Sequence, residues 1–194
     1  MLIAAIVACL LPQSLMAAII TSDVTGGKLT VVSDADDPIS ITCDTLQVKV
    51  NGADPNPATL CALINEIEVT GGPLQNTIDL NTVATLEFTT LVTVTVDGAG
   101  DSDVITGTFL ADTLNGGAGN DRVIGHRGAD TMNGDGDDDT MVWNPGDGSD
   151  IADGGDGNDT MEVNGGITET FTISASEGSV RFDRLSPGPF NVQI

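Results

Sequence analysis

Residues 98–162 read GAGDSDVIT-GTFLADTLN-GGAGNDRVI-GHRGADTMN-GDGDDDTMV-WN-PGDGSDIAD-GGDGNDTME, which is seven nine-residue units with a two-residue insertion, Trp143-Asn144. Every unit has Asp in its sixth position, and every unit except the one at Pro145 opens with Gly. The units from Gly116 and Gly154 match all fixed positions of the pattern G-G-x-G-x-D-x-U-x, in which U is a large apolar residue. A short period of this kind indicates a fold built from stacked repeats.

The apolar residue in the eighth position predicts how the units pack. Gly in the early positions allows a tight turn, and we expect the last three positions to be extended, with the middle one pointing inward. No unit can bury its own apolar residue, so neighbouring units must stack. We expect two units to form one coil, with successive turns on opposite edges. The predicted inward column is Ile105, Leu114, Val123, Met132, Met141, Ala152 and Met161.

The sixth-position aspartates then fall into two stacks, one on each edge. Stacked carboxylates repel one another, and a hard cation between consecutive turns removes that repulsion. Calcium suits this place because it takes about six to eight oxygen ligands from carboxylates and backbone carbonyls, whereas magnesium needs a small octahedral shell. We call Asp103, Asp121, Asp139 and Asp159 the first ladder, and Asp112, Asp130 and Asp150 the second ladder.

The match to the calcium-binding pattern varies from turn to turn along the repeats. The strongest sites are expected between the turns at Gly116 and Gly134 and between those at Gly134 and Gly154, whereas Leu110 makes the turn at Gly107 poor. The ligand needs of calcium predict about three to five ions. We expect the insertion to bulge outward or to put the ladders out of step. Besides the two ladders, the candidate metal-site residues are Gly116, Gly117, Gly119, Asp137, Gly154, Gly155 and Gly157.

These units resemble the RTX family, also called haemolysin-type calcium-binding repeats, over about a third of the chain. The resemblance implies an all-β fold, a right-handed parallel β-roll or β-solenoid that calcium orders outside the cell. The family includes toxins, proteases, lipases, adhesins and surface-layer proteins. The motif therefore predicts calcium binding and leaves the role of the parent protein open.

Charge and composition exclude other classes of function. The formal net charge is −23, and most of the Asp residues lie between residues 97 and 159, so nucleic acid is not an expected partner. The single histidine, His126, falls in a turn, and neither H-E-x-x-H nor G-x-S-x-G occurs. The carboxylates follow the calcium spacing rather than that of a catalytic pair. We therefore expect no enzyme activity.

Residues 1–18 form an apolar segment that resembles a secretory signal peptide, although it lacks the usual positive start. A retained membrane anchor and a truncated upstream sequence are the alternatives. Removal of the segment would remove Cys9 and leave Cys43 and Cys61. An even pair in an exported protein predicts a disulfide; two buried thiols are the other possibility. An extracellular or cell-surface location, of the bacterial secreted type, is expected.

The segments on either side of the repeats are rich in short extended runs. Residues 19–97, here called the lead-in, are expected to form irregular solenoid coils. Residues 59–66 read as one or two helical turns. Residues 163–194 are expected to form a β-hairpin around Glu177-Gly178, as a cap or as the start of a further repeat segment of a longer chain. The strands expected in the lead-in cover residues 28–33, 38–43, 46–50, 66–70, 76–80, 84–88 and 91–96.

The sequence thus predicts a secreted or cell-surface calcium-binding structural or adhesion module whose repeats fold on binding calcium. Its partners would be calcium, neighbouring repeats of a longer chain, and a cell-surface or extracellular-matrix component. The alternative is a calcium-dependent secretion and folding module of a larger exported toxin or hydrolase. A third possibility is a carbohydrate- or ice-binding face made of outward threonines, such as Thr113 and Thr131, which Arg122 and Ile151 interrupt.

Overall fold

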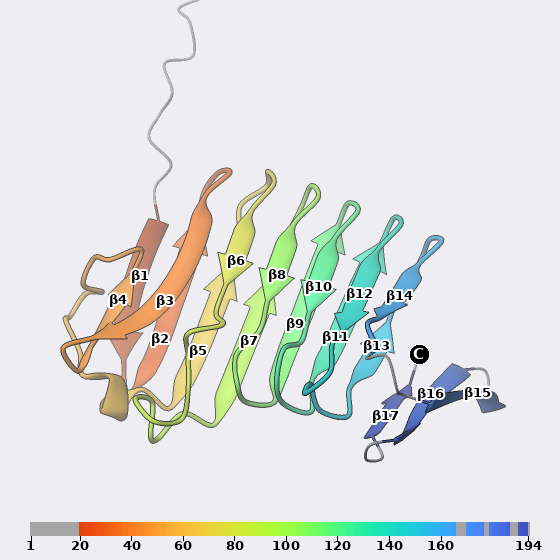
Figure 1. Ribbon diagram of the computed structural model, residues 1–194. Coiled ribbons are helices and arrows are strands. Elements are labelled where there is room, and N and C mark those ends of the chain that lie inside the picture. Colours follow the sequence, from red (N-terminus) through yellow and green to blue (C-terminus); the bar gives the residue numbers. More distant parts are fainter. Residues whose placement is uncertain (1–19, 166–169, 177–178, 187–189, 194) are drawn as a thin grey trace, which may run out of the picture.

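The computed structural model describes residues 20–165, 170–176, 179–186 and 190–193, and its regular secondary structure is almost entirely β-strand, arranged in two sheets (Figure 1). The ten strands of the first sheet are, in spatial order, β1 (Ile20–Thr25), β2 (Lys28–Ser33), β5 (Glu66–Thr70), β7 (Thr93–Asp97), β9 (Asp112–Ala118), β11 (Thr131–Gly136), β13 (Ile151–Asp153), β17 (Phe190–Gln193), β16 (Ser179–Ser186) and β15 (Thr170–Ser176). The seven strands of the second sheet are β14 (Thr160–Val163), β12 (Thr140–Trp143), β10 (Arg122–Ile124), β8 (Val104–Thr106), β6 (Thr77–Asp79), β3 (Pro38–Asp44) and β4 (Gln47–Val50).

Consecutive strands of the repeats alternate between the two sheets, and neighbours within each sheet are parallel. In the second sheet Val123 pairs with Ile105, and in the first sheet Met132 pairs with Leu114. Each pair is separated by two nine-residue units, so two units make one coil. The all-β, parallel architecture predicted from the repeat is therefore confirmed, with the turns on two opposite edges (Figure 1).

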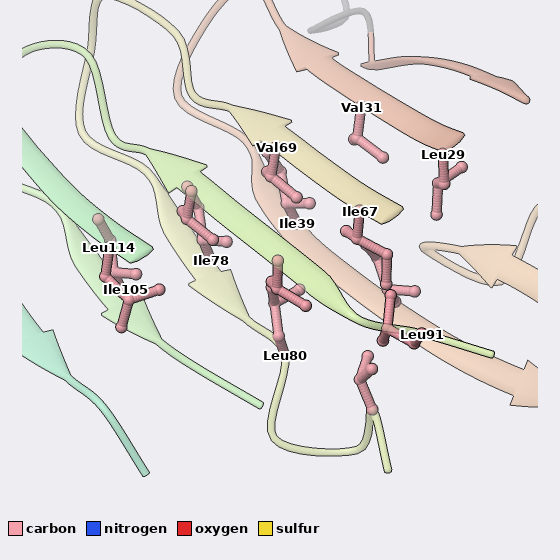
Figure 2. Close-up of a cluster of buried hydrophobic side chains, with 14 of the residues drawn as sticks. Leu29, Val31, Ile39, Ile67, Val69, Ile78, Leu80, Leu91, Ile105 and Leu114 are labelled. Atoms are coloured by element: carbon pink, nitrogen blue, oxygen red, sulfur yellow. The ribbon is translucent and has the colours of Figure 1, made fainter. Parts of the chain in front are cut away.

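A single column of apolar side chains runs between the sheets. In the repeats it consists of the eighth-position residues, from Ile105 to Met141 fully buried, with Ala152 at 2% exposure and Met161 partly buried at the end. In the lead-in the core continues through buried aliphatic residues and is wider, because one strand can bury two of them, such as Leu29 and Val31 of β2 (Figure 2). Branched aliphatics on extended backbone explain why these short strands hold together with few aromatics.

The lead-in combines parallel coils with two antiparallel hairpins. β1 pairs antiparallel with β2 and β3 with β4, whereas β2, β5 and β7 are parallel neighbours. β7 pairs in parallel with β9, so the first sheet passes from the lead-in into the repeats without a break. The helical expectation for residues 59–66 is met by one short 3₁₀ helix, η1 (Cys61–Leu63). A disulfide joins Cys43 to Cys61, with their Cα atoms 6.0 Å apart.

One expected strand of the lead-in was wrong. Residues 84–88 form a turn, in which the N–H groups of Glu87 and Phe88 both donate to Ala84 O. Phe88 is 1% exposed and enters the core. Ala84, Leu86 and Phe88 alternate as in a strand, but Leu86 is 86% exposed, so a single buried aromatic anchors a turn instead.

The expectation that the insertion shifts the stacking was also wrong. Across Trp143-Asn144 the register simply grows from 18 to 20 residues, so that Thr131 pairs with Ile151 and Thr140 with Thr160. Trp143 extends β12 by one residue, is fully buried, and donates from its indole Nε1 to Gly148 O at 3.2 Å. The extra residues are taken up by a longer strand and a tight turn, and both ladders stay in step.

The hairpin expected at the C-terminal side is present as β15 and β16, which pair antiparallel. β17 pairs antiparallel with β16 and meets β13 through the register pair Ile151 and Gln193. The signal-peptide-like segment and Cys9 lie outside the described residues. Among the residues that the structure does describe, none belongs to a helix with the length and apolar character needed to span a bilayer.

Candidate metal centres

The turns at the two edges stack on one another through glycine. A Cβ on Gly119, whose φ is +117°, would lie within 3.0 Å of the Asp101 backbone in the turn before it. Gly117 and Gly155 contact the preceding turns in the same way, through Ala99 and Asp135. This close approach is available only without a side chain. It brings the backbone carbonyls of consecutive turns close together.

Within these turns each ladder forms a chain of hydrogen bonds. The Asp103 N–H donates to Asp121 Oδ1 at 2.7 Å, and the Asp121 N–H donates to Asp139 Oδ1 at 2.8 Å. The second ladder repeats the arrangement from Asp112 to Asp130, at 2.9 Å. The structure therefore brings the predicted aspartates together in the predicted order. The remaining links join Asp139 to Asp159 and Asp130 to Asp150, each at 3.0 Å.

The second oxygen of these carboxylates has no protein partner. Among the described residues, buried side-chain oxygens without a hydrogen bond are Oδ2 of Asp103, Asp121, Asp130, Asp139 and Asp150. All five residues are at most 2% exposed. Buried polar groups are normally hydrogen-bonded, and a buried carboxylate oxygen without a donor is costly. Such oxygens in five of the seven repeat turns call for a positive partner.

The first-position glycines leave the space for that partner. A Cβ on Gly98 would lie within 3.0 Å of both Asp103 Oδ2 and Gly116 O, the carbonyl of the next turn on that edge. A Cβ on Gly134 would meet Asp139 Oδ2 and Gly154 O in the same way. A carboxylate oxygen and a backbone carbonyl thus converge on a small space between two turns. Oxygen ligands of this kind are those that calcium prefers.

Side chains alone do not complete such a site. Within the described part of the chain, no three His, Cys, Asp or Glu side chains gather closely enough to hold an ion. The ligand set that fits therefore combines a ladder carboxylate with backbone carbonyls of the turns above and below it. This mixture is ordinary for calcium, which accepts both.

Burial raises the pKa values of the ladder carboxyls. The pKa of Asp130 rises to about 8 and that of Asp103 to about 7, mainly because burial disfavours the charged form, and neighbouring ladder carboxylates add to the effect. The pKa values of Asp121 and Asp150 rise to about 6 for the same main reason. Without a cation, burial therefore makes the ladder carboxyls easier to protonate than exposed carboxyls.

Asp112 differs from the other ladder members because a residue of its own turn donates hydrogen bonds to both of its carboxylate oxygens. The Thr108 N–H donates to Asp112 Oδ2 at 2.6 Å, and the Thr108 hydroxyl donates to Asp112 Oδ1 at 2.8 Å. These donors stand where the other turns have none. The arrangement agrees with the poor calcium turn expected at Gly107.

Several predicted candidates lie at the margin of the ladders. Asp137 has a positive φ of 76° and an exposed side chain, so the structure does not bring its carboxylate into the first ladder. Asp159 is exposed at the far end of that ladder. Gly116 and Gly154 border the Oδ2 atoms of Asp121 and Asp159, respectively. Gly157 approaches the Asp137 backbone and completes the turn stacking.

One ladder residue, Asn76, was missed by the sequence reasoning. Its N–H donates to Asp103 Oδ1 at 2.6 Å, which adds a member before Asp103. The signal was available in the stretch GGPLQNTID from Gly71, which keeps the first two glycines and the apolar eighth residue but has Leu74 in the fourth position and Asn in the sixth. Because the motif is defined by Asp at that position, the stretch does not match it.

His126 is part of turn packing on the second edge. Its Nδ1 lies 3.2 Å from Thr108 O, and its ring makes an edge-to-face contact with Phe109 at 4.7 Å between centroids. Arg127 lies over the same Phe109 ring, 5.3 Å from its centroid. These contacts place the histidine among the turns of the repeats.

Comparison with protein families agrees with this geometry. The family model described as the RTX calcium-binding nonapeptide repeat (4 copies) matches residues 106–141 and 146–167. Comparison with curated proteins found no match to the chain. Repeats of this family bind calcium and are structural, non-catalytic modules. The matched segments, which hold most of both ladders, belong to the family of RTX calcium-binding nonapeptide repeats.

Proposed function

We propose that this chain is a secreted or cell-surface structural module whose repeats fold on binding calcium. The observation that carries the proposal is the set of five buried Oδ2 atoms without a partner, each in a turn of the repeats. Calcium would supply the positive charge that these oxygens lack and would be shared with backbone carbonyls of the neighbouring turns. One role of the ion is thus to turn a repulsive stack of carboxylates into an attractive one.

The same atoms suggest where the ions bind. On the first edge, Asp103, Asp121 and Asp139 each direct an unpaired oxygen toward the following turn, which gives three candidate sites. On the second edge, Asp130 gives a fourth and Asp150 lies at the end of its ladder. This assignment falls within the range of about three to five ions that calcium's ligand needs suggest.

The proposed location rests on the lead-in. The Cys43–Cys61 disulfide is typical of proteins in oxidising compartments, such as the extracellular space. Calcium of the concentration found outside cells would keep the repeats folded there. An adhesion or matrix role is supported by the elongated stack of strands, which offers two long faces (Figure 1).

A calorimetric calcium titration of two charge-matched variants tests the proposal. Asp139→Asn removes a buried ladder carboxylate, and Asp156→Asn removes the same charge from an exposed position two turns along the chain. We expect Asp139→Asn to weaken calcium binding at least about tenfold, equivalent to about 1.4 kcal/mol, and Asp156→Asn to change it little. Equal losses in both variants would show that only the general negative charge attracts calcium.

A further inference from the structure

The first ladder ends inside the lead-in, on the neutral residue Asn76. The Asn76 N–H donates to Asp103 Oδ1 at 2.6 Å, as the Asp103 N–H donates to Asp121 Oδ1 at 2.7 Å. Asn76 is 1% exposed, and Ile78 two residues later is fully buried in the core column. The turn before β6 therefore has the shape of a repeat turn, with an amide in the place of the carboxylate.

The space in this turn is also built like a repeat site. A Cβ on Gly71 would lie within 3.0 Å of Asn76 Oδ1 and Gly98 O, the same two kinds of atom that surround the first glycine of a repeat. Here, however, the side chain is satisfied by protein. Asn76 Oδ1 accepts the Gly72 N–H at 2.5 Å, and Nδ2 donates to backbone carbonyls, the nearer being Ala35 O at 2.7 Å. No charge and no unpaired oxygen remain.

The second ladder begins in a similar way. Its first member, Asp112, receives both the N–H and the hydroxyl of Thr108, so neither of its oxygens lacks a donor. Asp112 opens β9, which pairs with β7 of the lead-in. Both ladders therefore start next to the lead-in, on side chains whose hydrogen bonds need no cation.

The lead-in itself is built without unpaired buried polar groups. Its buried carboxylate, Asp37, accepts a hydrogen bond from the Ser33 hydroxyl at 2.8 Å. The described residues before Asp103 contribute no buried side-chain oxygen that lacks a partner. Its core contains more buried aliphatic residues than that of the repeats, and the Cys43–Cys61 disulfide constrains it further. Such a segment can be stable without metal.

We propose that residues 28–97 form a metal-independent template, onto which the calcium-dependent coils fold. Asn76 is the positioning residue of this template because its N–H fixes the first carboxylate of the first ladder while its amide keeps calcium unnecessary in its own turn. This inference rests on the proposed calcium dependence of the repeats. It adds a division of the chain into one part that folds alone and one part that folds on it.

Segment-resolved hydrogen–deuterium exchange of the whole chain tests the template. In chelator, residues 28–97 should remain protected while residues 104–162 exchange quickly. Free calcium at 100 times its Kd should then slow exchange in residues 104–162 by at least about 100-fold, since binding of one ion alone shifts the folding equilibrium by that factor. A lead-in that exchanges as fast as the repeats in chelator would overturn the inference and leave the proposed function standing. Repeats that calcium does not protect would overturn the proposed function itself.

Two variants of one turn test the role of Asn76. In the unmodified chain the carbonyls of Ala35 and Asp37 accept hydrogen bonds from Asn76 Nδ2. Asn76→Asp places a carboxylate oxygen against these carbonyls instead. We expect exchange of residues 28–97 in chelator to become at least about tenfold faster, because a buried acceptor loses its donor. Gln75→Glu adds the same charge on an exposed neighbour and should leave exchange unchanged. Equal exchange in both variants would contradict the role of Asn76. If Asn76→Asp does not fold, the exchange of the unmodified chain still tests whether residues 28–97 form the template.

Discussion

The two carboxylate oxygens of one ladder aspartate have different surroundings, and this difference explains how the carboxylate can hold an ion. Oδ1 of Asp121 accepts the backbone N–H of Asp103, which fixes the position of the carboxylate. Oδ2 of Asp121 is buried with no partner. A hydrogen bond thus orients each carboxylate while one oxygen is left for the ion. The sixth position needs Asp because a neutral amide, as at Asn76, makes its hydrogen bonds with other protein groups instead.

The glycine that opens each unit has a role that a pair of alanine variants can measure. Gly134→Ala would place a methyl group against Asp139 Oδ2 and Gly154 O, in the space that we assign to calcium. We expect a calcium affinity at least about tenfold lower, or about 1.4 kcal/mol, in a calorimetric titration. Gly136→Ala, in the same turn, meets nothing within 4 Å and serves as the control. A Gly134 variant with the affinity of the Gly136 variant would place the ion elsewhere.

The ranking of the ladder aspartates gives a second test at this scale. Asp121→Ala or Asp139→Ala should weaken calcium binding more than Asp112→Ala does, because Thr108 already satisfies both oxygens of Asp112. Calcium titration of the three variants under one set of conditions measures the difference. We expect a gap of about tenfold, or about 1.4 kcal/mol; equal losses would refute the ranking.

Among the elements, the sequence predicted those parts that follow a period. The short extended runs at 28–33 and 66–70 predicted β2 and β5, and the nine-residue spacing predicted which strands stack. Residues 84–88 failed because Phe88 anchors a turn there. The effect of the insertion was mispredicted because burial of Trp143 depends on the interior that the coil offers, which spacing does not report. Asn76 was missed because an amide that is hydrogen-bonded to the protein replaces the Asp that defines the motif.

The ladders as elements should respond to pH in opposite ways with and without calcium. In the metal-free fold, burial raises the pKa values of the ladder carboxyls, to about 8 for Asp130 and about 6 for Asp121. A folded pKa above the unfolded one means that the folded state binds more protons, so this stability is full below the unfolded pKa of about 4. It is lost as pH rises through about 6 to 8.

Thermal unfolding of metal-stripped protein measures this dependence. The repeats should be more stable at pH 5.5 than at pH 8 without calcium, as judged by the transition temperature. Calcium binds the ionised form, so its affinity should fall over the same interval as pH is lowered. A metal-free chain that is more stable at pH 8 would contradict the assignment of the buried carboxyls.

For the whole molecule, charge and architecture together make calcium a structural requirement of the repeats. More than half of the formal net charge of −23 lies in residues 98–162, whereas the lead-in has the larger aliphatic core and the disulfide. Self-repulsion of this size opposes compaction unless counter-ions bind. The same two sheets pass through both parts, so a folded lead-in presents strand edges on which the next coils can pair (Figure 1).

Far-UV circular dichroism of the whole chain, in chelator and after calcium is restored, tests the central claim most directly. We predict that the β signal falls in chelator, because residues 98–162 lose their order, and returns with calcium but not with equimolar magnesium, whose small octahedral shell suits these turns less well. A residual β signal from the lead-in should remain in chelator. A spectrum with the same β signal in chelator and in calcium would contradict the account.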